Sequence, residues 1–92
     1  MMRTPKTGGP SVGSIREKFY LTYPPHLLTE PLIYTVGQKF KVVTNIRGAS
    51  ISHEMGLVAV ELEGVRGEID RAVTWLRSRG VQVEPIEKNV IE

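Results

Sequence analysis

Two apolar stretches, Lys41-Val42-Val43-Thr44-Asn45-Ile46-Arg47 and Leu57-Val58-Ala59-Val60-Glu61-Leu62-Glu63, decide the fold of this chain. Both are rich in β-branched and aliphatic residues, which is typical of β-strands. The segment between them, residues 48–56, is too long for a tight turn and still alternates in character. We therefore predict a hairpin whose first strand runs on past an irregularity at Gly48 and turns at Met55-Gly56.

The chain before this hairpin predicts a strand and a short helix. Residues 16–23 alternate as a strand does, and Pro24-Pro25 end it because proline cannot donate to a β-ladder. The sequence Thr29-Glu30-Pro31 is typical of a helix start, with Thr29 as the capping residue. The helical period ends near Lys39.

The chain after the hairpin predicts a second helix and a last strand. We expect Gly64 to form a corner that leads into a helix over residues 66–78. Apolar residues recur there at spacings of three and four, as in a helix that covers a core; they are Ile69, Ala72, Val73 and Leu76. Gly80 suits a left-handed C-terminal cap, and residues 81–86 alternate as a strand.

The resulting order, β-α-β-β-α-β, predicts an α+β fold of the ferredoxin-like type. Two right-handed βαβ units around a central hairpin give a four-stranded antiparallel sheet with both helices on one face. The opposite face carries Val, Tyr and Thr side chains, so a second subunit is the simplest cover for it. We therefore expect a homodimer.

Length and composition predict one domain with two short tails. The chain has 92 residues, of which 40% are hydrophobic, enough for one small core. We expect a flexible N-terminal tail over residues 1–15, the folded domain over residues 16–87 and a short C-terminal tail over residues 88–92. No apolar stretch approaches the ~20 residues of a membrane helix.

Several classes of function are disfavoured by composition. The chain has no cysteine, which excludes disulfides, iron–sulfur clusters and thiol catalysis and fits a cytoplasmic protein. Arg3 and Lys6 account for the excess of basic residues, so the remainder is neutral and a nucleic-acid partner is not expected. His26 and His53 have no matching carboxylate spacing for a metal site. We expect no cofactor and no enzymatic activity, since no nucleophile elbow or carboxylate pair is present.

The ordered set of these segments resembles the NIL domain, a ferredoxin-like module named for an Asn-Ile-Leu motif. The resemblance covers roughly residues 17–87 and rests on several segments in sequence, listed here: Pro31-Leu32-Ile33, Asn45-Ile46-Arg47 followed by Gly48, residues 56–64, Ala72-Val73-Thr74-Trp75-Leu76 and residues 80–84. Arg47 stands where the name-giving leucine would be. No Walker-type phosphate loop is present, so the resemblance is to a freestanding bacterial module rather than to a transporter ATPase.

The resemblance implies a dimer that joins sheets and binds methionine near its interface, as at the C-terminus of methionine-import ATPase subunits, where the bound amino acid inhibits import. It gives Asn45 a role in that binding. We accordingly predict a ligand site for an amino acid or related sulfur compound, with Asn45 as polar contact, Ile46 as apolar wall, and Arg47 or His53 as partners of the carboxylate.

Each of these residues also has a simpler interpretation. Asn45 can satisfy backbone groups near Gly48, Arg47 can be a solvated charge at a strand end, and His53 can lie at a strand edge. Trp75 fits packing at the edge of the sheet better than base stacking. The alternative function is a protein–protein interaction module without a ligand, which acts through its sheet face or an edge strand.

Overall fold

The computed structural model describes residues 13–86 of the chain. In chain order the elements are strand β1 (Ser14–Tyr23), a single 3₁₀ turn η1 (Pro25–Leu27), helix α1 (Leu32–Lys39), strands β2 (Val43–Ile51) and β3 (Gly56–Val65), helix α2 (Arg66–Ser78) and strand β4 (Gln82–Pro85). Most of the predicted N-terminal tail and all of the predicted C-terminal tail lie outside the described residues. β1 begins at Ser14, two residues earlier than expected.

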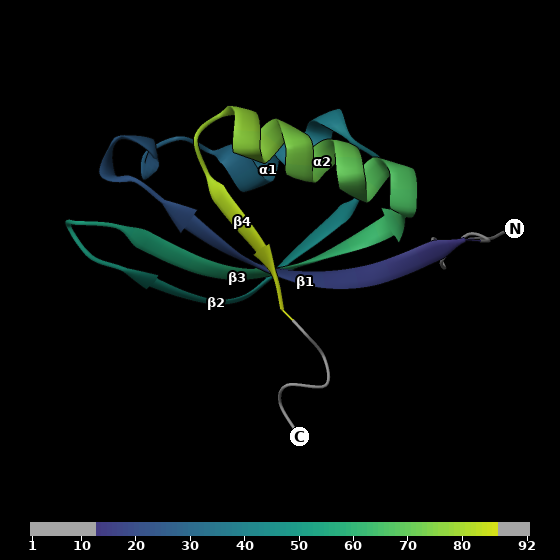
Figure 1. Cartoon of the computed structure of the whole chain (residues 1–92), viewed down its shortest axis with the longest axis horizontal. Helices are drawn as coiled ribbons and strands as arrows, with labels where there is room; N and C mark the ends of the chain where they lie inside the picture. Colours follow the sequence, from purple (N-terminus) through teal and green to yellow (C-terminus); the bar gives the residue numbers. More distant parts are fainter. Residues whose placement is uncertain (1–12, 87–92) are drawn as a thin grey trace, which may run out of the picture.

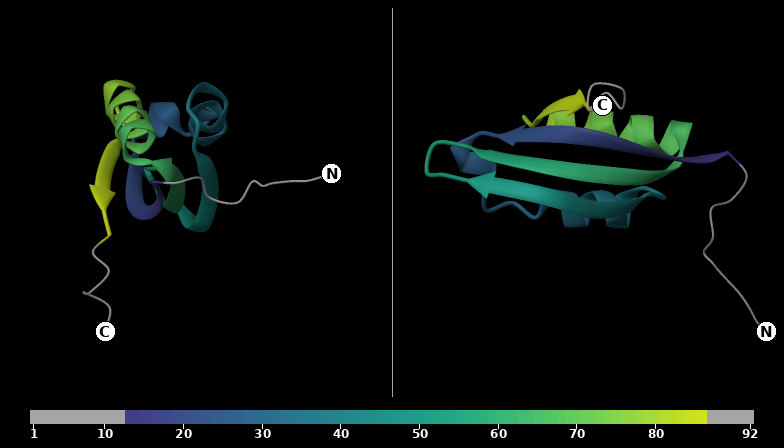
Figure 2. Two further views of the ribbon diagram at one scale, coloured as in Figure 1. Left: turned by 90° about the vertical axis from the view of Figure 1, so that its right-hand side faces the viewer. Right: turned by 90° about the horizontal axis from the view of Figure 1, so that it is seen from below.

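The four strands form one antiparallel sheet in the order β2-β3-β1-β4, and both helices lie on the same face of it (Figure 1). Seen from below, the strands lie in front of the helices and present an uncovered face (Figure 2, right). This arrangement confirms the predicted ferredoxin-like α+β fold. β2 and β4 are the two edges of the sheet. Neither described helix has the length and apolar character that a membrane span requires.

The core lies between the helices and the sheet because alternate residues of the central strands point to the helix side. The side chains with almost no exposed surface are Leu21, Leu62, Ile69, Leu76, Val36 and Val60. They come from β1, β3, α1 and α2, so the predicted stripe of α2 packs directly on the two inner strands. Gly80, at φ 104°, closes α2 with a Schellman motif in which the Val81 N–H donates to the Leu76 carbonyl at 3.1 Å.

The predicted cap of the first helix is wrong. Pro31 occupies the cap position, with φ −82° and ψ 60°, and no side chain caps the helix. Thr29 lies too far upstream because the chain first closes a short turn in which the Glu30 N–H donates to the Leu27 carbonyl at 3.1 Å. The Thr35 hydroxyl instead donates to the Pro31 carbonyl at 2.8 Å.

Gly64 is not a corner: β3 continues through it to Val65, and Gly64 faces Ile15 of β1. Its role is a close backbone approach. A Cβ atom on Gly64 would lie 2.8 Å from the Lys41 carbonyl oxygen and 3.2 Å from Cγ1 of Val42. Glycine therefore lets the segment that enters β2 pack directly on the backbone of β3.

The hairpin turn also lies earlier than predicted. β2 runs past Gly48, as expected, but it ends at Ile51, which pairs with Gly56. The turn is residues 52–55 and is held by Ser52, whose N–H donates to the Met55 carbonyl at 2.9 Å and whose hydroxyl accepts the N–H of Glu54 at 3.2 Å. Serine offers the backbone this local alternative to a continued ladder.

Glu68 connects α2 to the segment that enters β2. Its carboxylate accepts the Lys41 N–H at 2.9 Å and pairs with Arg71. The hydrogen bonds from Arg71 and then from Lys41 lower the pKa of Glu68 below its ordinary value of 4.5.

This lowered pKa predicts an acid-sensitive contribution to stability. The folded state holds the Glu68 proton less tightly than the unfolded chain, so the contribution is present above pH 4.5 and is lost as pH falls through the lowered pKa. Denaturant unfolding between pH 3 and 6 is expected to show a smaller pH dependence in Glu68→Gln than in the wild type. Glu84→Gln, an exposed carboxylate on β4, serves as the matched control, and an equal effect of both changes contradicts the assignment.

Candidate ligand-binding site

The motif region of β2 forms a bulged edge strand. Ile46 faces Val60 and Gly48 faces Ala59, so Arg47 is an extra residue with no partner on β3. On its other side, β2 has no neighbouring strand among the residues that the structure describes. Bulges redirect side chains and increase local twist, and they are common at sheet edges and beside binding sites.

The four predicted site residues lie along this edge without meeting in one pocket. Asn45 is opposite Glu61 and therefore points to the uncovered face of the sheet, whereas Ile46 is opposite Val60 and points to the helix side. The Arg47 guanidinium lies 3.5 Å from the Glu61 carboxylate, an exposed pair of the kind that contributes little stability. His53 is exposed in the hairpin turn, beyond the end of β2.

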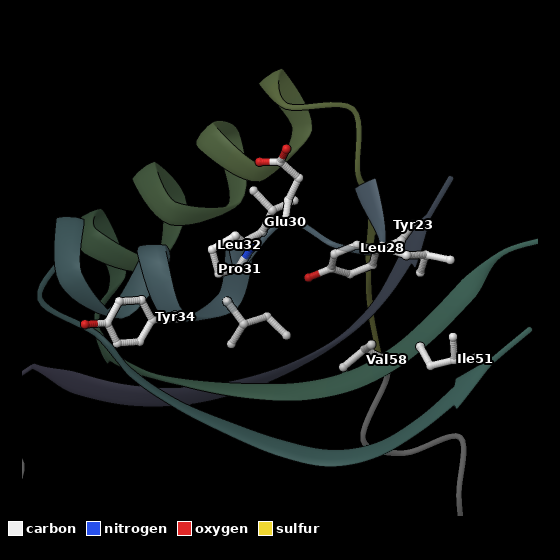
Figure 3. A pocket seen from close by; sticks show the side chains of 9 residues that line it. Tyr23, Leu28, Glu30, Pro31, Leu32, Tyr34, Ile51 and Val58 are labelled. Carbon is white, nitrogen blue, oxygen red and sulfur yellow. The ribbon is translucent and has the colours of Figure 1, made fainter. Parts of the chain in front are cut away.

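A pocket that the sequence did not reveal lies on the helix side, between the start of α1 and the far end of the hairpin (Figure 3). Its volume is about 210 Å³, and it is open on one side. We call it the Tyr23 pocket, and its lining residues are Tyr23, Leu28, Glu30, Pro31, Leu32, Ile33, Tyr34, Ile51 and Val58. It is therefore built from β1, the connection to α1, α1 itself and both arms of the hairpin.

Tyr23 places a polar group inside this apolar pocket. Its side chain is 6% exposed, and its hydroxyl points into the space between α1 and the sheet (Figure 3). Burial raises the pKa of Tyr23 to about 12. No hydrogen bond to this hydroxyl is formed by residues 13–86. A buried phenol normally has a partner, so this one is a candidate ligand contact.

Gly56 keeps the inner end of the pocket narrow but open. It pairs with Tyr23 on one side and with Ile51 on the other. A Cβ atom on Gly56 would lie 2.5 Å from Cδ2 of Leu28 and 3.0 Å from Cδ1 of Ile51. A Cβ atom here would therefore displace both of these lining side chains.

A second, shallower groove runs between the end of α1 and α2. Phe40 and Trp75 meet edge to face there, with ring centroids 6.3 Å apart. The ammonium of Lys39 lies 5.9 Å from each ring, and the Arg79 guanidinium lies 6.0 Å from the indole. Trp75 thus packs at the periphery of the core, as expected. Within residues 13–86, no three histidine or acidic side chains gather as metal ligands would.

The ferredoxin-like sheet, the bulged edge strand β2 and the small, mostly apolar Tyr23 pocket define a small α+β domain with a candidate ligand cavity beside α1. The profile of the NIL domain matches residues 19–85, and the chain belongs to this family. The chain is also similar to the methionine import ATP-binding protein MetN 1 of Listeria innocua, with 34% identity over 62 residues. The match covers 63% of this chain but only 18% of that protein's length.

Proposed function

We propose that this chain is a regulatory module that binds an amino acid, methionine or a related sulfur compound, at the interface of two copies. The observation that carries the proposal is the bulged edge strand β2, where Asn45 and Ile46 of the family motif are exposed beside an unpaired bulge residue. The name of the Listeria innocua relative, a methionine import protein, supports methionine as the first ligand to test.

The proposed dimer follows from the free hydrogen-bonding groups along the edge strand β2. An unpaired edge strand presents a row of backbone N–H and C=O groups that can pair with another strand. Large apolar side chains are also exposed along β2, including Ile46 at 60% and Ile51 at 61%. Antiparallel pairing with β2 of a second copy would bury these groups and join the two sheets about a two-fold axis.

Asn45 and the Tyr23 pocket are too far apart in one copy to contact the same amino acid. Asn45 points to the uncovered face and the pocket opens on the helix side. Ile51, at the pocket, lies six residues further along β2, which is roughly 20 Å of extended strand. A free amino acid is too short to span that distance, so within one copy the proposed ligand would contact either Asn45 or the pocket.

Replacing Asn45 with alanine is expected to weaken methionine binding about tenfold, because a hydrogen bond of an uncharged amide contributes about 0.5–1.5 kcal/mol. Asn45 is exposed, so the melting temperature of the free protein should barely change. Isothermal titration calorimetry with methionine measures the effect, supported by thermal shift at saturating ligand. Ser50→Ala, on the same face of β2, is the control, and an unchanged affinity in Asn45→Ala excludes this role.

A second candidate function is a protein–protein interaction module. The exposed apolar side chains of β2, which has a free edge among the described residues, favour this function because a partner strand would bury them. Such a module would use the β2 edge to pair with a strand of another protein. Absence of a thermal shift with any amino acid, together with a monomeric mass by light scattering, would favour this function over the first.

A further inference from the structure

We infer that the Tyr23 pocket is a binding subsite for an unbranched apolar group that carries a hydrogen-bond acceptor, such as a thioether side chain or its sulfoxide. The inference rests on the proposed function only where it assigns this group to a free amino acid. The pocket, its walls and its polar group are properties of the single chain.

The dimensions of the pocket select a side chain rather than a whole drug-sized molecule. Its volume of about 210 Å³ lies below the roughly 300–1,000 Å³ of complete small-molecule sites. It is larger than the ~150 Å³ apolar cavity that holds a benzene ring. A group of about five or six heavy atoms therefore fits, and the polar remainder of the ligand would stay at the open side.

Most of the pocket lining is apolar, and Glu30, Tyr23 and Tyr34 carry its polar groups. Leu32 and Val58 are buried in the core, and Pro31 fixes the backbone where α1 begins. Leu28 and Ile51 lie at the hairpin end of the pocket, next to Gly56. A pocket formed before binding loses little conformational entropy when it is filled.

The Tyr23 hydroxyl sets the chemical preference. It is buried among apolar groups, points into the pocket and has no hydrogen-bond partner among the described residues. A ligand atom that accepts a hydrogen bond from this hydroxyl replaces the bond to water that the phenol lost on burial. A sulfoxide oxygen accepts strongly, a thioether sulfur weakly and a methylene group not at all. We therefore expect affinity to follow that order among groups of equal length.

Nuclear magnetic resonance with two neutral probes, butyl methyl sulfoxide and butyl methyl thioether, tests the subsite without an amino acid. Both probes are expected to shift the δ-methyl signals of Ile33 and Ile51 and to leave that of Ile69, which lies in the closed core, unchanged. Tyr23→Phe should weaken the sulfoxide about tenfold and change the thioether less than twofold. Equal effects on the two probes, or no shift at Ile33 and Ile51, would overturn the inference.

Two further measurements keep the result interpretable. Gly56→Ala, which displaces the lining side chains of Leu28 and Ile51, should abolish the shifts from both probes while the other methyl signals stay dispersed. Methionine is then titrated into the wild type. If the probes bind as expected and methionine does not, the subsite stands and the proposed function fails. If methionine binds without moving the Ile33 and Ile51 signals, the proposed function stands and the subsite fails.

Discussion

Replacement of Ile69 by alanine is expected to lower the free energy of unfolding by about 3–4 kcal/mol. Ile69 is 0% exposed and lies in the stripe of α2 that packs on the inner strands, so its truncation loses apolar burial and leaves a cavity. The total stability of so small a domain is about 5–10 kcal/mol, so this one change removes a large share of it. Urea unfolding followed by circular dichroism measures the loss.

Ile46→Ala is the matched control for that experiment. Ile46 points to the same side of the sheet but is 60% exposed, because α1 does not cover this part of β2. Its truncation should cost less than about 1 kcal/mol in the monomer, since little buried area is lost. Similar losses in Ile69→Ala and Ile46→Ala would mean that the packing of α2 on the sheet is wrong.

Gly64→Ala is expected to destabilise the chain by about 1–3 kcal/mol, or roughly 10 °C in melting temperature. The added Cβ would lie 2.8 Å from the Lys41 carbonyl oxygen, a backbone atom that cannot rotate away as a side chain can. Relief therefore requires the segment entering β2 to move off β3. Thermal unfolding of the purified variant checks the prediction.

Gly48→Ala is the control, because it is a glycine of β2 with ordinary φ and nothing within 4 Å of its Cβ position. In the open space beside the bulge, alanine should leave stability unchanged or raise it slightly, as it restricts the unfolded chain. If Gly48→Ala is as damaging as Gly64→Ala, the cost comes from the loss of glycine itself and not from contact with Lys41.

The fold was predictable because apolar residues recur along the chain at the spacing typical of each helix or strand. The spacing of Ile69, Ala72, Val73 and Leu76 defines α2 at both ends, and alternation defines β1 and β3. The features that were predicted wrongly depend on the local path of the backbone or on a contact between distant segments. Thr29 has the chemistry of a cap, but the turn after Leu27 moves the helix start to Leu32. Gly64 looks like a corner unless the position of Lys41 is known.

The candidate site was only partly predictable for the same reason. The sequence motif directs attention to Asn45, whose exposed position on the edge of the sheet is visible only in the structure. The Tyr23 pocket is assembled from five segments, and most of its lining residues look like ordinary core in the sequence. One signal was present: alternation puts Tyr23 on the same face as Leu21, so its hydroxyl has to enter an apolar interior where a partner is required.

The extra residue in β2 also decides where this strand tolerates a change in length. Ile46 and Ile51 are five positions apart, so in a regular strand they would lie on opposite faces, yet both point to the helix side. The bulge at Arg47 makes the difference. A chain without Arg47 would keep every other side chain on its present face, whereas a one-residue deletion elsewhere in β2 would turn part of the strand over. One-residue deletions in β2 among relatives should therefore collect at this position.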